Sequence, residues 1–295
     1  FLDNINYIKD FSPSNKLKLF NFYLEIVSVQ LFSKVVKRDI DLPLKSISLL
    51  NTNPNLNNSL IKLENELPEV TIQDILDILC EIYPLFVNSV SRKNSGSEYT
   101  SPPIVNFMLD EIEYNTQNIV DKKLLDPSCG SGAFILAALE RYIKLSQESK
   151  REILNKLLFE NILVGIDINP INVIITKLRF VLKILQSLEL DNEEIRLLIK
   201  DLPIKEGNTL STNSLLKENS SLIIDNYYDF VIGNPPYIRL HRLSPDVKSE
   251  IKEKYQSATG RFDLYVCFME KSVNLLKDGG KVSLITSNKY LTANY

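Results

Sequence analysis

The 295-residue sequence predicts an α/β protein built on a doubly wound, mainly parallel sheet with a separate helical part before it. Two observations predict this fold class. From residue 120 onward, short apolar runs alternate with helical segments, which is the βαβ pattern of a parallel sheet. Glycine is scarce, with nine residues in all, and none of them lies in residues 1–95. We therefore expect a helical accessory domain over residues 1–95 and an α/β catalytic domain over residues 96–295.

The composition limits the class of protein. Hydrophobic residues make up 44% and charged residues 24%, as in soluble globular proteins. No apolar run reaches about 18 residues and the N-terminus lacks the pattern of a signal peptide, so we expect no membrane contact. The first residue is not methionine, which suggests a trimmed chain. The net charge of −3 argues against a compact basic nucleic-acid module, so a DNA-binding surface would be local or lie outside this chain.

Cysteine and histidine usage narrows the chemistry further. The three cysteines are far apart in the sequence and form neither a disulfide framework nor a metal-binding pair, which indicates a reducing cytoplasm. The sequence contains one histidine, His241, so a Ser-His-Asp triad or a histidine-rich metal site is nearly excluded. We therefore expect no metal.

Residues 1–95 read as helices without recognisable chemistry. Leu17–Val36 carries apolar residues at helical spacing, and Thr71 is a plausible N-cap for a helix over Ile75–Phe86. We find no nuclease signature in this part. The polar segment Ser91–Ser97 is a plausible linker to the second domain.

The second part divides into alternating strands and helices. Strands are predicted at Lys123–Asp126, Leu163–Asp167, Ile204–Gly207, Asp229–Gly233 and, after a Gly279-Gly280 turn, Lys281–Thr286. Helices are predicted at Ala133–Leu145, Ile171–Leu188 and Phe262–Leu276. In such sheets, ligands bind beyond the carboxyl ends of the strands, and four candidate segments lie there.

The first candidate segment is a glycine turn between the first strand and its helix, with the sequence DPSCGSGAF from Asp126 to Phe134. Gly130 and Gly132 allow a ligand to approach the backbone, and the helix start offers free N–H groups. The dinucleotide fingerprint would need a third glycine where Ile135 stands, and the Gly-Lys-Ser/Thr of a phosphate loop is missing. Asp126 could alternatively cap the following helix.

The second and third candidate segments follow the next two strands. Asp167 can accept both hydroxyls of a ribose, although it could instead cap the next helix, a role for which Asn169 competes. In Gly207-Asn208-Thr209, Asn208 can bond an adenine edge, or it can be a simple turn asparagine. Each alternative is open when the residue is taken alone.

The fourth candidate segment, Asn234-Pro235-Pro236-Tyr237, follows the fourth strand directly. The two prolines fix the backbone, so the Asn234 amide oxygen and the Pro235 carbonyl are presented together. Two neighbouring acceptors suit one NH₂ group on a planar conjugated system, on which Tyr237 can stack. We expect more than a simple turn here.

A basic segment, residues 238–262, follows this turn. It contains six basic and three acidic residues, a net charge of +3 in a chain that totals −3. This suits contact with nucleic-acid phosphates, and the alternative is a solvated helix face of mixed charge.

Taken together and in this order, DPSCGSGAF, GIDINP, GNTL and NPPY resemble the S-adenosyl-L-methionine-dependent N6-adenine DNA methyltransferases of restriction-modification systems, in their gamma motif order. The resemblance covers about residues 96–295. It implies the Rossmann-like sheet of class I methyltransferases, S-adenosyl-L-methionine as cofactor, and double-stranded DNA with a flipped adenine as substrate. It also implies a cytoplasmic transferase that acts in DNA methylation, with a restriction or specificity subunit as a possible partner.

The resemblance also assigns residues. The catalytic residues it implies are Asn234, Pro235 and Tyr237. The cofactor-binding residues it implies are Tyr99, Thr100, Asp126, Ser128, Gly130, Gly132, Phe134, Asp167, Ile168, Asn208, Asn234 and Phe268. The sequence departs from the family pattern at Ser101, which intervenes between Thr100 and Pro102, and at Asn208, where the family usually has Asp.

Other assignments are open at this point. A methyltransferase for a protein glutamine amide or an RNA guanine amino group would use the same Asn-Pro-Pro-Tyr/Phe chemistry. A non-catalytic DNA-binding subunit could retain the fold, whereas a nicotinamide dehydrogenase does not fit the glycine pattern. We further expect the C-terminal part of the sheet and a target-recognition domain to be missing from this chain.

Overall fold

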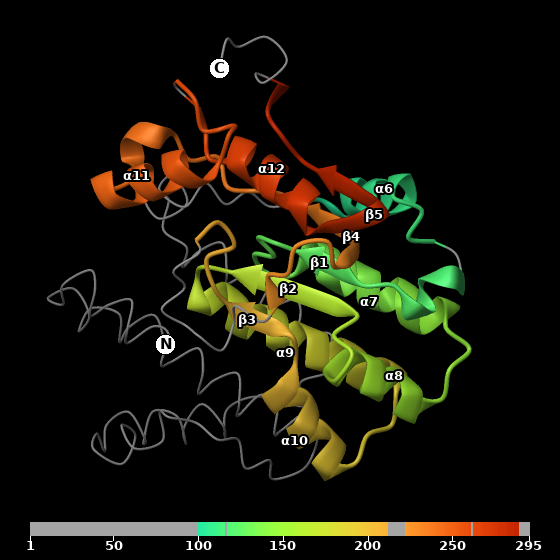
Figure 1. Cartoon of the computed structure of the whole chain (residues 1–295). Coiled ribbons are helices and arrows are strands. Elements are labelled where there is room, and N and C mark those ends of the chain that lie inside the picture. The colour runs from blue at the N-terminus through green and yellow to red at the C-terminus, as the bar shows by residue number, and fades with distance from the viewer. Residues whose placement is uncertain (1–99, 116, 212–221, 261, 289–295) are drawn as a thin grey trace, which may run out of the picture. The chain divides into compact units, whose positions relative to one another are not determined.

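A computed structural model describes residues 100–115, 117–211, 222–260 and 262–288 of the chain. The described part contains the whole predicted sheet (Figure 1). The expected helical domain over residues 1–95 lies outside the described residues.

Five parallel strands form one sheet in the order β3-β2-β1-β4-β5, which confirms the predicted α/β class. The strands are β1 (Leu124–Asp126), β2 (Leu163–Asp167), β3 (Ile204–Glu206), β4 (Tyr228–Gly233) and β5 (Leu276–Leu284). Asp126 pairs with Gly165, and Asp167 pairs with Glu206. The chain therefore leaves neighbouring strands at the same edge of the sheet.

Helices cover the sheet and fill its connections. They are α6 (Pro102–Glu111), α7 (Ala133–Leu145), α8 (Lys150–Leu158), α9 (Pro170–Ser187), α10 (Asn192–Asp201), α11 (Pro245–Lys254) and α12 (Tyr265–Leu275). Two short 3₁₀ helices are η2 (Gln117–Asp121) and η4 (Leu240–Arg242). In this described part, no helix combines the length and the apolar character needed to cross a bilayer.

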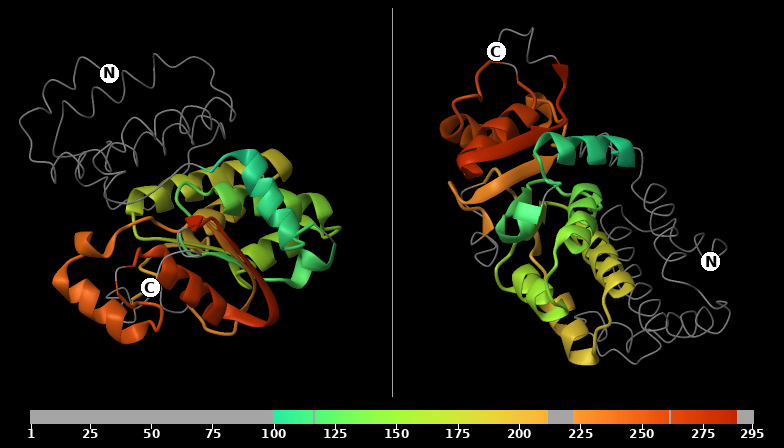
Figure 2. Two further views of the ribbon diagram at one scale, coloured as in Figure 1. Left: turned by 90° about the horizontal axis from the view of Figure 1, so that it is seen from above. Right: turned by 90° about the vertical axis from the view of Figure 1, so that its right-hand side faces the viewer.

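The direction of winding decides which face each helix covers. The chain runs outward from β1 through α7 to β2 and through α9 to β3, and it runs the other way from β4 through α12 to β5. Because such crossovers are right-handed, α7 and α9 share one face and α12 covers the other (Figures 1 and 2). The strand order reverses between β1 and β4, and this is the point where α/β sheets bind ligands.

Burial explains why the central strands read as unbroken apolar runs. Every residue of β1 and β2 is buried, including Asp126 and Asp167. On α7, the side chains that face the sheet are also buried, among them Phe134, Ile135 and Leu139. A strand covered on both faces cannot alternate with polar residues, so continuous hydrophobicity is the expected signal.

The last strand differs from its prediction. Tyr228 pairs with Leu276, and the next pairs join Phe230 to Lys281 and continue from there, so β5 carries extra residues between the two pairings. Gly279 lies in this irregularity with a φ of +75°, a conformation that favours glycine. The predicted Gly279-Gly280 turn is therefore a bulge inside the strand rather than a turn before it.

A carboxylate ties three strands together at the amino edge of the sheet. The Asp229 side chain accepts a hydrogen bond from the Lys123 backbone N–H (2.9 Å) and ion-pairs with Lys277 (3.1 Å) and Lys122 (3.3 Å). Burial alone would raise the pKa of Asp229, but these hydrogen bonds outweigh it, so the pKa lies below its ordinary value. Asp229 thus joins the start of β1, β4 and β5.

Candidate functional site

The segments that follow β1, β2, β3 and β4 meet around one cavity of about 340 Å³. Ten of the predicted site residues line it: Thr100, Asp126, Ser128, Gly130, Phe134, Asp167, Ile168, Asn208, Asn234 and Phe268. These residues come from positions as far apart as 100 and 268. The parallel sheet brings them together because it ends all its strands at one edge.

Asp126 lies at the floor of this cavity and is fully buried. Its Oδ1 atom accepts a hydrogen bond from the Ser128 N–H (3.0 Å), whereas Oδ2 is buried without a hydrogen-bond partner among the described residues. Burial raises the pKa of this carboxyl well above its ordinary value. The hydrogen bond from Ser128 opposes this shift, and the negative charge of Asp167 adds to it. Asp126 Oδ2 is therefore a buried acceptor atom that receives no hydrogen bond in the described part of the chain.

Gly233 allows this arrangement, because a Cβ atom there would lie 2.8 Å from Asp126 Oδ1. Gly132, at the start of α7, has a φ of +89°, and a Cβ atom on it would lie 2.8 Å from a methyl carbon of Thr176. Gly132 itself is not part of the cavity wall. Its role in this structure is close packing between the turn and α9.

Asp167 is buried at the end of β2 and holds the glycine turn. Its Oδ2 atom accepts a hydrogen bond from the Gly130 N–H (2.9 Å), and Oδ1 accepts from the Asn169 N–H (2.8 Å) and from Asn172 Nδ2 (3.0 Å). Burial raises the pKa of the Asp167 carboxyl, although these three hydrogen bonds counteract it. The Asp167 carboxylate therefore bonds mainly to the protein itself. Oδ2 accepts one of these hydrogen bonds and Oδ1 accepts two, so Oδ2 retains more acceptor capacity for a ligand.

The segment after β3 is fastened to the glycine turn. Thr209 Oγ1 donates to the Pro127 carbonyl (2.6 Å), and the Asn208 side-chain oxygen accepts from the Leu210 N–H (3.1 Å). Asn208 therefore makes the local contact of a turn asparagine and also lines the cavity, and its bond to an adenine edge stays a prediction.

Asn234 lies at the end of β4 with its side chain at the cavity wall. Its Nδ2 atom donates to Thr100 Oγ1 (3.2 Å), and its Oδ1 atom is buried without a hydrogen-bond partner among the described residues. The Asn234 carbonyl accepts from Ser128 Oγ (3.3 Å), which links this turn to the one after β1. The Asn234 side chain thus contributes to the wall of the cavity that the other strand ends share.

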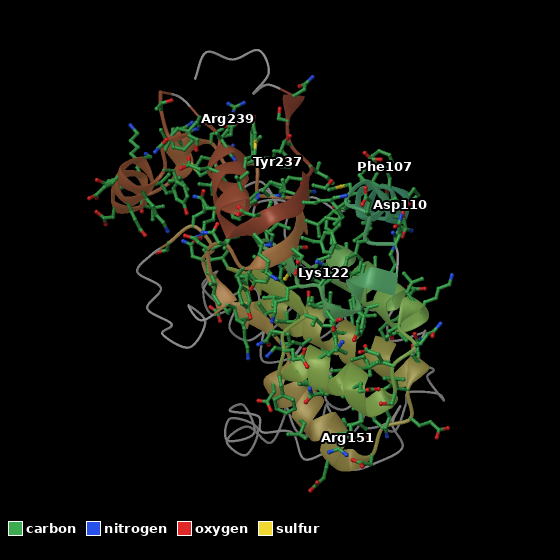
Figure 3. All side chains as sticks on the ribbon, turned by 45° about the vertical axis from the view of Figure 1, so that its right-hand side comes forward. Phe107, Asp110, Lys122, Arg151, Tyr237 and Arg239 are labelled. Carbon is green, nitrogen blue, oxygen red and sulfur yellow. The ribbon has the colours of Figure 1, made fainter. Side chains whose placement is uncertain are left out.

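The remaining residues of the Asn-Pro-Pro-Tyr turn surround this position. Pro236 lines the cavity, whereas Pro235 is buried beside it and outside the wall. The Tyr237 hydroxyl donates to the Ile285 carbonyl just after β5 (2.9 Å), and its ring lies 5.8 Å from that of Tyr265. Tyr237 lies near α12 and β5 in Figure 3. Tyr99 lies outside the described residues.

The sequence did not predict one whole wall of the cavity. It is apolar, apart from one carboxylate, and is formed by Leu243, Val247, Glu250, Ile251 and Leu264. Most of it belongs to α11, inside the segment that charge alone marked as a phosphate-contacting region. The Ser244-Pro245 start and the i, i+4 pair of Val247 and Ile251 were the available signals for a helix with one apolar face.

The cavity contains no group of three or more His, Cys, Asp or Glu side chains suited to a metal ion, and neither does the rest of the described part of the chain.

Residues 161–295 match the family model of the Eco57I restriction-modification methylases. This part of the chain is therefore similar to a restriction-modification methylase domain. Among characterised proteins, the Type II methyltransferase M.BstVI of Geobacillus stearothermophilus is 30% identical over 213 residues, which cover 71% of this chain and 36% of that protein. The Type II methyltransferase M.PaeR7I of Pseudomonas aeruginosa is 24% identical over 68% of this chain and 33% of its own length. The chain thus spans about a third of these relatives.

Solved structures of restriction-modification enzymes share the fold of this chain. The cryo-EM structure of a DrdV–DNA complex superposes with a TM-score of 0.66 at 17% identity and covers 96% of this chain and 31% of that one. The Type ISP restriction-modification enzyme LlaBIII bound to DNA gives a TM-score of 0.57 at 16% identity, over 93% of this chain and 22% of that one.

Proposed function

We propose that the chain transfers a methyl group from S-adenosyl-L-methionine to the N6 amino group of adenine in double-stranded DNA, as the modification component of a cytoplasmic restriction-modification system. The observation that carries this is Asn234, which lines a cavity that Asp126 and Asp167 also line and whose buried Oδ1 atom has no hydrogen-bond partner in the described part of the chain. The similarity to Type II methyltransferases and to a protein named as the adenine-specific methyltransferase PglX supports it.

The cavity suits the proposed cofactor. Two of its lining residues, Asp126 and Asn234, each have a buried oxygen that finds no hydrogen-bond partner within the described ranges, and one long wall is apolar. Asp126 and Asp167 would hold polar groups of the cofactor, and Ile168 and Phe268 would contact its base. The sulfonium of the bound cofactor supplies an electrophilic methyl group.

The residues of the β4 turn would prepare the acceptor amine. The lone pair of an exocyclic adenine amine is delocalised into the ring, which makes it a poor nucleophile. Hydrogen bonds from the NH₂ group to Asn234 Oδ1 and to the Pro235 carbonyl draw the nitrogen toward tetrahedral geometry and localise the lone pair. Most of the catalytic effect then comes from position and orientation. The base must leave the duplex to reach this site, and Tyr237 would stack on it.

The decisive variant is Asn234→Ala in the full 295-residue chain. We expect it to abolish methyl transfer to duplex DNA and to retain most of the cofactor affinity, because the amide acts on the acceptor amine. Transfer is measured with labelled S-adenosylmethionine and the product by mass spectrometry of the DNA nucleosides. Cofactor affinity is measured by calorimetry.

Asn274→Ala, an exposed position on α12, is the matched control and should behave as wild type. A near-normal rate in Asn234→Ala would overturn the assignment of this residue. A wild-type chain that does not bind S-adenosylmethionine would overturn the proposed function. Methylation of a protein glutamine or of RNA guanine in place of DNA adenine would support the alternative acceptors.

A further inference from the structure

We propose that Glu250 recognises the base of the cofactor, by accepting a hydrogen bond from the exocyclic amino group of its purine. This inference rests on the proposed function and adds a residue to the cofactor site that none of the sequence motifs contains. Four observations carry it: the division of the cavity into two ends, the position of Glu250, the rigidity of its helix, and the local commitment of Asn208.

The cavity has a polar end and an apolar end. Thr100, Asp126 and Asn234 form the polar end, beside the turn where transfer is proposed. The other end belongs to an apolar cluster that joins the segment after β3 to α11 and α12, with Leu210, Ile251, Tyr255, Ala258, Phe262, Leu264, Cys267 and Phe268 buried in it. A flat aromatic base fits such walls, and a few placed polar groups then fix which base it is.

Glu250 is a charged side chain in this apolar wall. It is half-buried, lines the cavity, and its Oε1 atom accepts a hydrogen bond from Ser211 Oγ (2.7 Å). The serine hydroxyl orients the carboxylate, whose two oxygens offer about four acceptor positions in all.

The helix that carries Glu250 is fastened to the same segment. Lys254 Nζ and the Tyr255 hydroxyl both donate to the Leu210 carbonyl, at 2.7 and 2.9 Å. Ile251, the next residue in the chain, is buried in the apolar cluster. Glu250 is therefore held at a defined place relative to β3, which is what recognition of one small group requires.

Asn208 is the residue that the family resemblance assigned to the amino group. Its side-chain oxygen accepts the Leu210 N–H (3.1 Å), so part of its acceptor capacity serves the turn. Glu250 adds a side-chain carboxyl acceptor at the same end of the cavity, and hydrogen bonds to carboxylates are about twice as strong as those to neutral groups. A base with a carbonyl in place of the amine would be repelled, because its oxygen carries a negative partial charge and the carboxylate is also negative.

The test is discrimination between two probes by calorimetry on the full chain. S-adenosylhomocysteine carries the 6-amino group, and S-inosylhomocysteine carries a carbonyl there. We expect wild type to prefer the adenine probe by about 10- to 100-fold, the range for a hydrogen bond to a charged group. Glu250→Gln should reduce the preference to about threefold or less, because an amide can turn its NH₂ toward the carbonyl.

Glu253→Gln is the matched control, since Glu253 is exposed on the same helix and does not line the cavity. It should keep the wild-type preference. Ser211→Ala is a second variant that leaves Glu250 in place but removes its anchoring hydroxyl, and it should lower the preference by a smaller factor. Thermal melts check that each variant is folded.

An unchanged preference in folded Glu250→Gln, or an equal loss in Glu253→Gln, would overturn the role of Glu250. Absence of S-adenosylhomocysteine binding by wild type is a different result, which would overturn the proposed function. The two failures are therefore distinguishable in one experiment.

Discussion

Asn234 shows how one side chain gains a direction from a distant residue. The sequence motif predicts its position after β4, but a motif says nothing about which way an amide turns. In the structure, Thr100 Oγ1 accepts from Nδ2, so Oδ1 is the atom left for a donor. The two residues are 134 positions apart, and their contact depends on the placement of the segment before α6. A sequence pattern cannot show that dependence.

Asp126 shows how a residue of the proposed site can lower the stability of the fold. One oxygen of its buried carboxyl group has no hydrogen-bond partner among residues that the structure describes, and burial raises the pKa of the group well above the ordinary value of 3.8. A raised pKa in the folded state means that the unfolded chain ionises more readily. Stability contributed by the protonated form is therefore lost as pH rises above about 4.

We expect Asp126→Asn to increase the free energy of unfolding at pH 7 by about 1–2 kcal/mol, because the folded wild type must bury either a charge or a proton that the unfolded chain releases at this pH. The gain should shrink as pH falls below about 4, where the carboxyl of the unfolded wild-type chain becomes protonated as well. The same variant should weaken S-adenosylmethionine binding. Urea denaturation at several pH values and calorimetry measure the two effects.

Glu253→Gln removes an exposed carboxylate and serves as the control for both measurements. If Asp126→Asn were no more stable than wild type at pH 7, this would contradict the view that the burial of Asp126 destabilises the folded chain.

At the scale of elements, burial decided which predictions were right. β2 and α7 have the predicted bounds, and β1, β3 and β4 differ by one residue at one end, because short apolar runs between helices fit a buried parallel strand. No helix was predicted for the α8 and α10 segments, although each begins with a capping box visible in the sequence. Ser149 with Glu152 caps α8, and Asp191 with Glu194 caps α10.

Two other elements could not be predicted from local signals. α6 begins with Pro102 and Pro103, which suit a first helical turn but equally suit a loop. β5 begins at Leu276 because it pairs with Tyr228 before the bulge, and this pairing depends on the neighbouring strand. Strand pairing is a property of two segments, so one segment read alone does not show it.

Asp229 holds elements together at the opposite edge from the cavity, and we expect Asp229→Ala to lower the free energy of unfolding by about 1–3 kcal/mol. The loss should leave cofactor affinity largely unchanged. Since hydrogen bonds hold the pKa of Asp229 below its ordinary value, its contribution is present above about pH 4 and is lost as pH falls further.

Chemical denaturation at pH 7 and at pH 3 tests both parts of the prediction. Asp278→Ala, an exposed position on β5, is the control and should change stability little. A destabilisation of Asp229→Ala that stays the same at both pH values would contradict the assigned cause.

At the scale of the whole molecule, the distribution of charge is more informative than its sum. The chain carries −3, whereas residues 238–262 carry +3 and follow the proposed transfer site. In the structure, the face of α11 that carries Val247 and Ile251 lines the cavity, while basic side chains such as Lys252 are exposed. The charge and the ligand site at the strand ends could be predicted from the sequence, but their union in one helix could not.

We expect Arg239→Ala to weaken binding of the full chain to duplex DNA and to reduce the salt dependence, with the slope of log affinity against log salt falling by about 0.9 for one lost phosphate contact. Arg151→Ala is the matched control. Figure 3 shows both arginines, Arg239 near α12 and Arg151 at the far end of the domain, and both are exposed.

Fluorescence anisotropy at several salt concentrations provides the slopes. Equal slopes for the two variants would argue against phosphate contact at Arg239 and favour a solvated face of mixed charge.

Cys129 lies in the cavity wall and is 4% exposed, and its sulfur would be 3.2 Å from a Cβ atom on Gly165. Burial, and then the charges of Asp167 and Asp126, raise the pKa of this thiol well above its ordinary value. A sulfur so enclosed and so rarely ionised resists alkylating reagents and peroxide while the domain is intact. The rate at which Cys129 becomes labelled, followed by peptide mass spectrometry, would therefore measure how often the domain opens.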